Sequence, residues 1–152
     1  MELSCLDGGS GNAPTSADGP TVGGLIFEGL VGNVEGSSPA DVGLSVPTGH
    51  PLYFIKAPAW LKGGSAKTTI ELSASSGGYL AWVPEGIWTG GGGGIDLTPW
   101  MTSTLVLDGC PQRDSTYFGG LLSTDPQICL TLHVSDAAGE SRQLHVGPTS
   151  RC

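Results

Sequence analysis

The sequence predicts an all-β domain, a single antiparallel β-sandwich stapled by disulfides, and three observations predict it. Glycine fills 26 of the 152 positions and proline fills 11, and both residues destabilise helix interiors. Apolar residues come in short runs that alternate with polar ones, which is typical of half-buried antiparallel strands. The four cysteines include no Cys-x-x-Cys pair, so they indicate structural disulfides rather than a zinc or redox motif.

The first 20 residues are expected to form an irregular N-terminal arm, followed by the β-sandwich domain over residues 21–152. Small, polar and turn-forming residues dominate the arm, and nothing in it alternates. Within the domain, nine short runs bounded by Gly, Pro, Ser or Asp are expected to be strands. In order along the chain they are LIFEGLV, VGLSV, LYFIK, TTIEL, YLAWV, STLVL, TYFGGLL, ICLTLHV and RQLHV.

The breaks between these runs are also predictable. Pro58 and Pro84 should end strands, because proline cannot donate to a ladder of backbone hydrogen bonds. The run of five glycines from Gly90 to Gly94 has no side chain to pack and is expected to be a surface loop that folding does not require. An immunoglobulin-like architecture is compatible with this pattern. Its hallmark is missing, because Cys110 and Cys129 lie close in sequence with no tryptophan between them.

The formal net charge of the chain is −8. Residues 1–55 contain six acidic residues and no lysine or arginine. Such a field repels phosphate backbones and anionic membrane surfaces, so a nucleic-acid partner is not expected. No apolar run reaches the length of a membrane span. A cationic partner remains compatible with this charge, as does the simpler interpretation that the charge keeps a glycine-rich surface soluble.

The cysteines are expected to pair as Cys110 with Cys129 and Cys5 with Cys152. The segment between Cys110 and Cys129 resembles two strands with a turn at 124–126, which would bring its ends together. Disulfides indicate an oxidising compartment, so the protein is expected to be secreted or displayed at the cell surface. The chain lacks the basic start and apolar run of a signal peptide, so we expect that the start methionine replaces a natural leader.

Three tryptophans, Trp60, Trp88 and Trp100, lie beside proline or glycine, where loops are expected. An exposed aromatic ring on a loop is suited to binding a protein or a glycan. The alternative is that these rings fold back and cap an open end of the sandwich, because small domains need the area that aromatic residues bury. Trp82 lies inside a strand and is expected in the core.

The segment CLTLHVSDAAGESRQLHVG is expected to be a hairpin, since two alternating runs flank a turn-forming sequence. Pairing residue 134 with residue 144 keeps the leucines and valines on one face. That register also sets His133 opposite His145, where two imidazoles could hold a zinc, nickel or copper ion. The alternative is a solvent-exposed pair without a metal.

No sequence motif identifies a catalytic reaction or a cofactor. The chain has no Gly-x-Ser-x-Gly elbow, and its carboxylates lie mostly in turns. Ser65 and Lys67 would share a face of a strand, which leaves a Ser-Lys dyad open. We therefore expect a non-enzymatic extracellular or cell-envelope domain that acts by surface recognition or assembly, with an unidentified protein or glycan partner or with copies of itself. The alternatives are a secreted hydrolase with an unrecognised site and a weak metal-binding protein.

Overall fold

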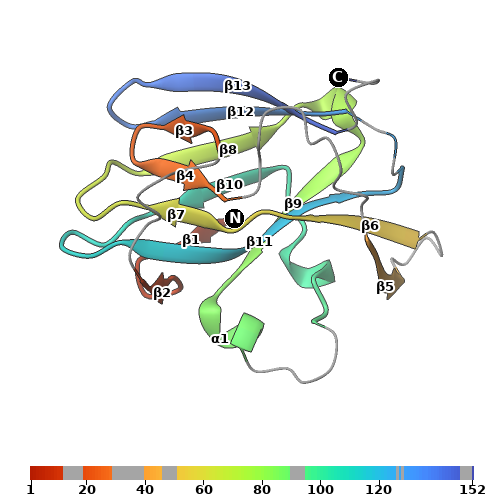
Figure 1. Cartoon of the computed structure of the whole chain (residues 1–152), viewed down its shortest axis with the longest axis horizontal. Coiled ribbons are helices and arrows are strands. Elements are labelled where there is room, and N and C mark those ends of the chain that lie inside the picture. The colour runs from red at the N-terminus through yellow and green to blue at the C-terminus, as the bar shows by residue number, and fades with distance from the viewer. Residues whose placement is uncertain are drawn as a thin grey trace.

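The computed structural model describes residues 1–11, 19–28, 40–45, 51–89, 95–125, 127, 129–147 and 152. Within these residues the chain is almost entirely β-structure, arranged as two packed sheets (Figure 1). The predicted all-β sandwich is therefore confirmed. All nine predicted strands are present. As predicted, strands end ahead of the two prolines: β9 ends at Val83, directly before Pro84, and β6 ends at Lys56, two residues before Pro58. The run from Gly90 to Gly94 lies outside the described residues.

The first sheet has five strands. Their order is β1 (Glu2–Leu3), β10 (Thr104–Leu107), β8 (Thr68–Leu72), β12 (Leu130–Asp136) and β13 (Ser141–Val146). All neighbours are antiparallel except β1 and β10, which run parallel. Alternate residues of β8 and β12 are buried, which places one face of the sheet against the core and the other in solvent.

The second sheet has eight strands. Its main path is β3 (Thr21–Val22), β4 (Leu25–Phe27), β7 (Ala59–Leu61), β11 (Ser115–Ser123), β6 (Pro51–Lys56) and β5 (Ala40–Ser45). Two further strands, β2 (Gly9–Ser10) and β9 (Gly78–Val83), pair with β11 along its other edge. Strand β11 is thus the centre of this sheet, with β7 and β6 on one side and β2 and β9 on the other.

Helical structure is limited to short segments in the described part of the chain. These are α1 (Glu85–Thr89) and two 3₁₀ turns, η1 (Ala74–Ser76) and η2 (Thr98–Trp100). The first turn of α1 follows Pro84, whose carbonyl oxygen accepts hydrogen bonds from the amides of Ile87 and Trp88. None of the described helices is long and apolar enough to cross a membrane.

The main core lies between the two sheets and draws on both. The first sheet contributes leucines, isoleucine and valines from β1, β8, β10, β12 and β13, and the second contributes aromatic and aliphatic side chains. The largest fully buried side chains include Trp82, Tyr117 and Phe27. Trp82 lies in the core as predicted, and its indole Nε1–H donates to the carbonyl oxygen of Ala57 at 3.0 Å, which satisfies its polar atom.

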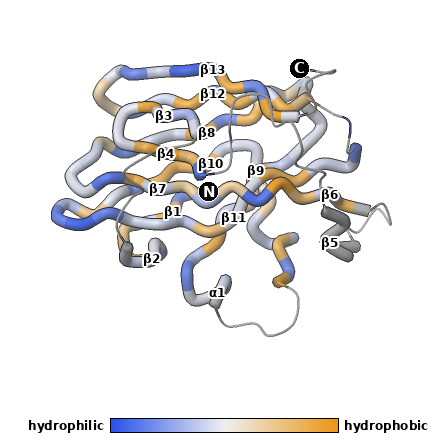
Figure 2. The backbone as a smooth tube through the Cα atoms, in the orientation of Figure 1, coloured by the Kyte–Doolittle hydropathy of each residue, from blue (hydrophilic) through white to orange (hydrophobic). Residues whose placement is uncertain are grey.

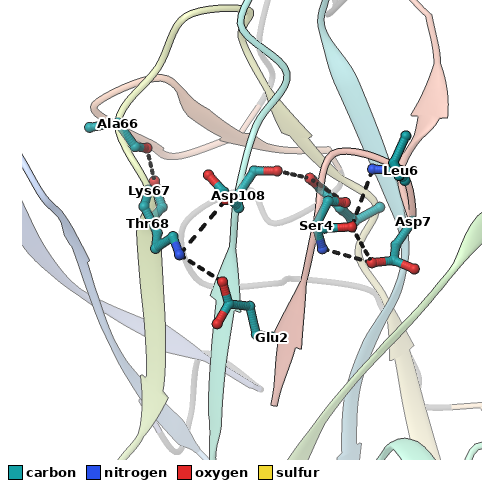
Figure 3. Close-up of polar contacts among 9 residues, drawn as sticks. Glu2, Ser4, Leu6, Asp7, Ala66, Lys67, Thr68 and Asp108 are labelled. Atoms are coloured by element: carbon teal, nitrogen blue, oxygen red, sulfur yellow. Dashed lines mark hydrogen bonds and ion pairs between the residues drawn. The ribbon is translucent and has the colours of Figure 1, made fainter.

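The N-terminal arm is less irregular than predicted. Leu3 is buried in the main core, and β1 and β2 attach the arm to both sheets. Lys67 forms an ion pair with Glu2 at 2.6 Å and lies 3.7 Å from Asp108 (Figure 3). The arm was not recognised as β-structure because strands of two residues are too short to show an alternating pattern.

The predicted disulfide pairing is wrong. The structure joins Cys5 to Cys110 and Cys129 to Cys152. The chain crosses between the sheets after β11, so β11 and β12 belong to different sheets and do not form the expected hairpin. Instead, the parallel pairing of β1 with β10 brings the chain after Leu3 alongside the chain after Leu107. This pairing sets Cys5 beside Cys110.

Candidate functional site

The outward faces of the two sheets differ in chemistry. The outward positions of the first sheet mostly carry hydroxyl, amide, imidazole and carboxylate groups: Thr69, Glu71, Thr104, Thr131, His133, Ser135, Gln143 and His145. The second sheet carries aromatic and aliphatic side chains on its outward face. In Figure 2, which colours each residue by hydropathy whichever way its side chain points, β13 is largely blue and β6 is largely orange. A polar outward face needs no further explanation, whereas an aromatic one does.

The register of β11 determines which side chains meet on this aromatic face. Tyr117 and Leu121 point into the main core, so Thr116 and Phe118 point outward. Thr116 lies directly opposite Trp60 of β7, whose neighbours Ala59 and Leu61 are core residues. Trp60 and Phe118 therefore lie on the same outward face, as diagonal neighbours on adjacent strands.

Trp60 is half-buried and held in a fixed orientation. Its Nε1–H donates a hydrogen bond to Oε2 of Glu28 at 3.0 Å. Gly11 lies against the six-membered part of its ring, since a β-carbon at Gly11 would come within 3.0 Å of Cζ3. The Trp60 ring provides a flat apolar surface, and the Glu28 carboxylate provides a hydrogen-bond acceptor at its edge.

Trp88 reaches the same face from α1. Its ring stacks on Phe118, with centroids 5.8 Å apart and planes inclined by 14°. The ammonium group of Lys56 lies 5.7 Å from the Trp88 centroid, a cation–π contact. We refer to Trp60, Phe118 and Trp88 together as the aromatic strip.

Trp100 has a different position. It is half-buried in η2 and packs both against the main core and against a second, smaller core on the outside of β6, β9 and β11. The fully buried members of that smaller core are Leu52, Ala81, Val83, Leu97 and Leu122. Trp100 therefore buries apolar area, as the predicted alternative describes, and Trp88 also packs against the smaller core. Of the three candidate tryptophans, the structure places two in the aromatic strip.

The predicted opposition of His133 and His145 is wrong. Strands β12 and β13 pair with His133 opposite Gln143 and His145 opposite Thr131. The His145 Nδ1 and Thr131 Oγ1 atoms lie within hydrogen-bond distance, at 3.2 Å. Among the described residues, no group of three or more His, Cys, Asp or Glu side chains could hold a metal ion. The geometry that motivated the two-histidine metal site is therefore not formed.

The cause of this error is the turn between the two strands. The Asp136 amide donates to the Glu140 carbonyl oxygen, and the Gly139 amide donates to the Asp136 carbonyl oxygen. Gly139 has a φ of 99°, as expected for the glycine that ends a three-residue hairpin loop. This loop shifts the register by two residues, which keeps every leucine and valine on its predicted face and separates the histidines.

A cluster of polar side chains lies beside the N-terminal arm (Figure 3). It includes Lys67, the base of the Ser-Lys dyad that the sequence left open. A hydrogen bond from the ammonium to Glu2, and the charges of Glu2 and Asp108, raise the pKa of Lys67 above its ordinary value. A catalytic lysine base needs the opposite shift. Lys67 therefore stabilises the position of the arm and is not suited to activating a serine.

Tyr117 lies at the inner side of the same cluster. Its hydroxyl donates to the Asp108 carbonyl oxygen at 2.8 Å, and the Ser4 carbonyl oxygen lies 3.4 Å away. Burial raises the pKa of Tyr117 to about 12. A buried tyrosine that is protonated and hydrogen-bonded to backbone is a structural residue.

This pKa predicts a loss of stability at high pH. An unfolded tyrosine loses its proton near pH 10, whereas folded Tyr117 retains it to about pH 12. The folded state binds the extra proton in that window, so stability should fall as pH rises through it, by about 2–3 kcal/mol in total. Urea unfolding at several alkaline pH values should show this decrease in the wild type and in Tyr79→Phe, whose ring is 39% exposed. Tyr117→Phe should lack it, and an equal decrease in all three proteins would contradict the assignment.

The chain was compared with known proteins. No protein-family model, no curated protein and no solved structure matches it. The function of this chain therefore has to be inferred from its own geometry. Phe118, Glu28 and Lys56 belong to the site, yet the sequence did not single them out. They are gathered by the pairing of β7 with β4 and of β11 with β6 and β7, which cannot be deduced from alternation.

Proposed function

We propose that this protein is a non-enzymatic extracellular or cell-envelope domain that recognises its partner through the aromatic strip. The observation that carries the proposal is the contrast between the two outward faces: one is polar, and the other carries Trp60, Phe118 and Trp88. Half-exposed aromatic rings held by neighbouring side chains provide contact area at low cost in conformational entropy, which is why tryptophan and tyrosine are enriched in binding surfaces.

Two features of the chain support an extracellular location. Its cysteines form two disulfides, which persist in oxidising compartments. Both disulfides tie down segments near the chain ends, as expected for a stable scaffold outside the cell. The net charge of −8 supports a partner that is neither a nucleic acid nor an anionic membrane.

The proposal is tested by comparing variants in a capture experiment. Immobilised wild-type protein and a Trp60→Ala/Trp88→Ala variant would be incubated with the extracellular material of the source organism, and bound material would be analysed. The double variant should lose the material that the wild type retains. Leu6→Ala serves as a control, because Leu6 is an apolar side chain that is 90% exposed and lies outside the strip. Equal capture by wild type and double variant would contradict the proposal.

A further inference from the structure

We infer that the aromatic strip binds a neutral glycan chain. This inference rests on the proposed function and names the chemical class of its ligand. A sugar ring has one face lined with C–H groups and an edge lined with hydroxyls. The matching protein surface is a flat aromatic ring with hydrogen-bond acceptors beside it, because the negative face of an aromatic ring attracts polarised C–H groups.

The surroundings of Trp60 have this composition. A carboxylate has about four lone-pair sites for hydrogen bonds, and among the described residues Glu28 accepts one, from Trp60 Nε1. Glu28 is exposed, so its remaining sites can accept hydroxyl groups of a sugar that stacks on the ring. The hydrogen bond to Glu28 also fixes the plane of the indole, which reduces the entropy that binding would otherwise cost.

A second polar group lies in the same place. The hydroxyl of Thr116, opposite Trp60, is buried, and Oγ1 has no hydrogen-bond partner among the described residues. A β-carbon at Gly11 would lie 3.6 Å from this oxygen, so the hydroxyl points toward the backbone beside the Trp60 ring. Buried polar groups without a partner are rare and cost about 1–3 kcal/mol. A hydroxyl-rich ligand that displaces the Gly11 backbone from this edge of the ring would supply the missing bond.

The charges near the strip select against anionic glycans. Glu28 lies beside Trp60, and Glu85 lies against Gly9 close to the Phe118 ring. The nearby cation, Lys56, contacts the ring of Trp88. With a net charge of −8 on the whole chain, uronic-acid or sulfated polymers would be repelled. Neutral hexose or pentose units remain.

The spacing favours a chain over a single sugar. Diagonal neighbours on adjacent strands have Cα atoms about 7–8 Å apart, and Trp60 and Phe118 are such neighbours. Trp88 stacks on Phe118 and fixes the orientation of that ring. One sugar unit would contact one ring, so the arrangement is suited to consecutive units. A proline-rich peptide also binds aromatic surfaces, but it offers few hydroxyl donors to Glu28 and Thr116.

The inference is tested by affinity electrophoresis in native gels that contain a soluble polysaccharide. The panel would include hydroxyethylcellulose, laminarin, galactomannan and arabinoxylan as neutral polymers and alginate as an anionic one. At least one neutral polymer should retard the wild type, and alginate should not. Trp60→Ala and Trp88→Ala should each weaken retardation about tenfold, while Leu6→Ala should bind as the wild type does. Thermal unfolding of each variant would establish that it is folded. A second measurement needs no substitution: the bound polysaccharide should protect the tryptophan fluorescence of the wild type from quenching by iodide.

The outcomes separate this inference from the proposed function. If no neutral polymer retards the wild type, or if alginate alone does, the glycan inference is overturned, and the capture experiment still decides the proposed function. Capture of a proline-rich peptide that depends on the two tryptophans would also overturn the glycan inference and leave the proposed function standing. Equal retardation of the wild type and both folded tryptophan variants would place glycan binding elsewhere and overturn the inference together with the role of the strip.

Discussion

Gly120→Ala is expected to destabilise the domain by about 3 kcal/mol or more, the range of severe overpacking in a closed interior. Gly120 lies in the middle of β11, between Lys56 of β6 and Ala81 of β9. A β-carbon there would overlap the carbonyl oxygen of Ile55. That oxygen belongs to the backbone of the neighbouring strand, so no rotamer change can relieve the overlap. Denaturant unfolding should show a large shift of the midpoint.

Gly86→Ala is the matched control for this substitution. A β-carbon at Gly86 would meet nothing within 4 Å, and Gly86 lies in α1, where alanine is preferred over glycine. This variant should be as stable as the wild type or slightly more so. If Gly120→Ala unfolds at the same denaturant concentration as Gly86→Ala, then β11 is not the closely flanked central strand described above.

Removal of the Cys5–Cys110 disulfide is expected to cost about 5 kcal/mol, and removal of Cys129–Cys152 about 3.5 kcal/mol. The loop-entropy model gives these values, because the two bonds link residues 105 and 23 positions apart, respectively. The first bond also holds β1 and the buried Leu3 against β10. The double variants Cys5→Ser/Cys110→Ser and Cys129→Ser/Cys152→Ser should therefore differ in their unfolding midpoints, with the first pair less stable.

Peptide mapping under non-reducing conditions provides the control for these variants. It should find the two pairs joined as stated, and it should find the remaining pair intact in each double variant. Peptides that link Cys110 to Cys129 would contradict the structure. A larger loss of stability from the Cys129 pair than from the Cys5 pair would contradict the argument from loop length.

Strand positions were predictable because a period of two survives in short runs such as Leu130–Asp136. The register between strands was not, since a shift of two residues preserves every inward position. The histidines show this directly: both registers bury Leu144 and Val146, and only the loop ending at Gly139 distinguishes them. The sequence carried that signal in the placement of one glycine.

The disulfides and the aromatic strip were harder to predict for a related reason. Both depend on which strands become neighbours, and sequence alternation contains no information on that choice. The parallel pairing of β1 with β10 joins segments about 100 residues apart. Likewise, Phe118 reaches Trp88 through the packing of α1 over β11, which only the tertiary structure reveals. The expectation that tryptophans beside proline or glycine lie in loops was wrong, because Trp60 lies in β7, Trp88 in α1 and Trp100 in η2. It also did not distinguish the three rings, which are all half-buried.

The claim that the aromatic strip is the recognition surface is tested most directly by the indole N–H resonances of the four tryptophans. Isotope-labelled wild-type protein would be titrated with an oligosaccharide prepared from the neutral polymer that retards it most, and followed by heteronuclear NMR. The Nε1–H signals of Trp60 and Trp88 should shift saturably, while those of buried Trp82 and of Trp100 stay in place. Shifts confined to Trp82 and Trp100, or no shift at any indole, would contradict the claim.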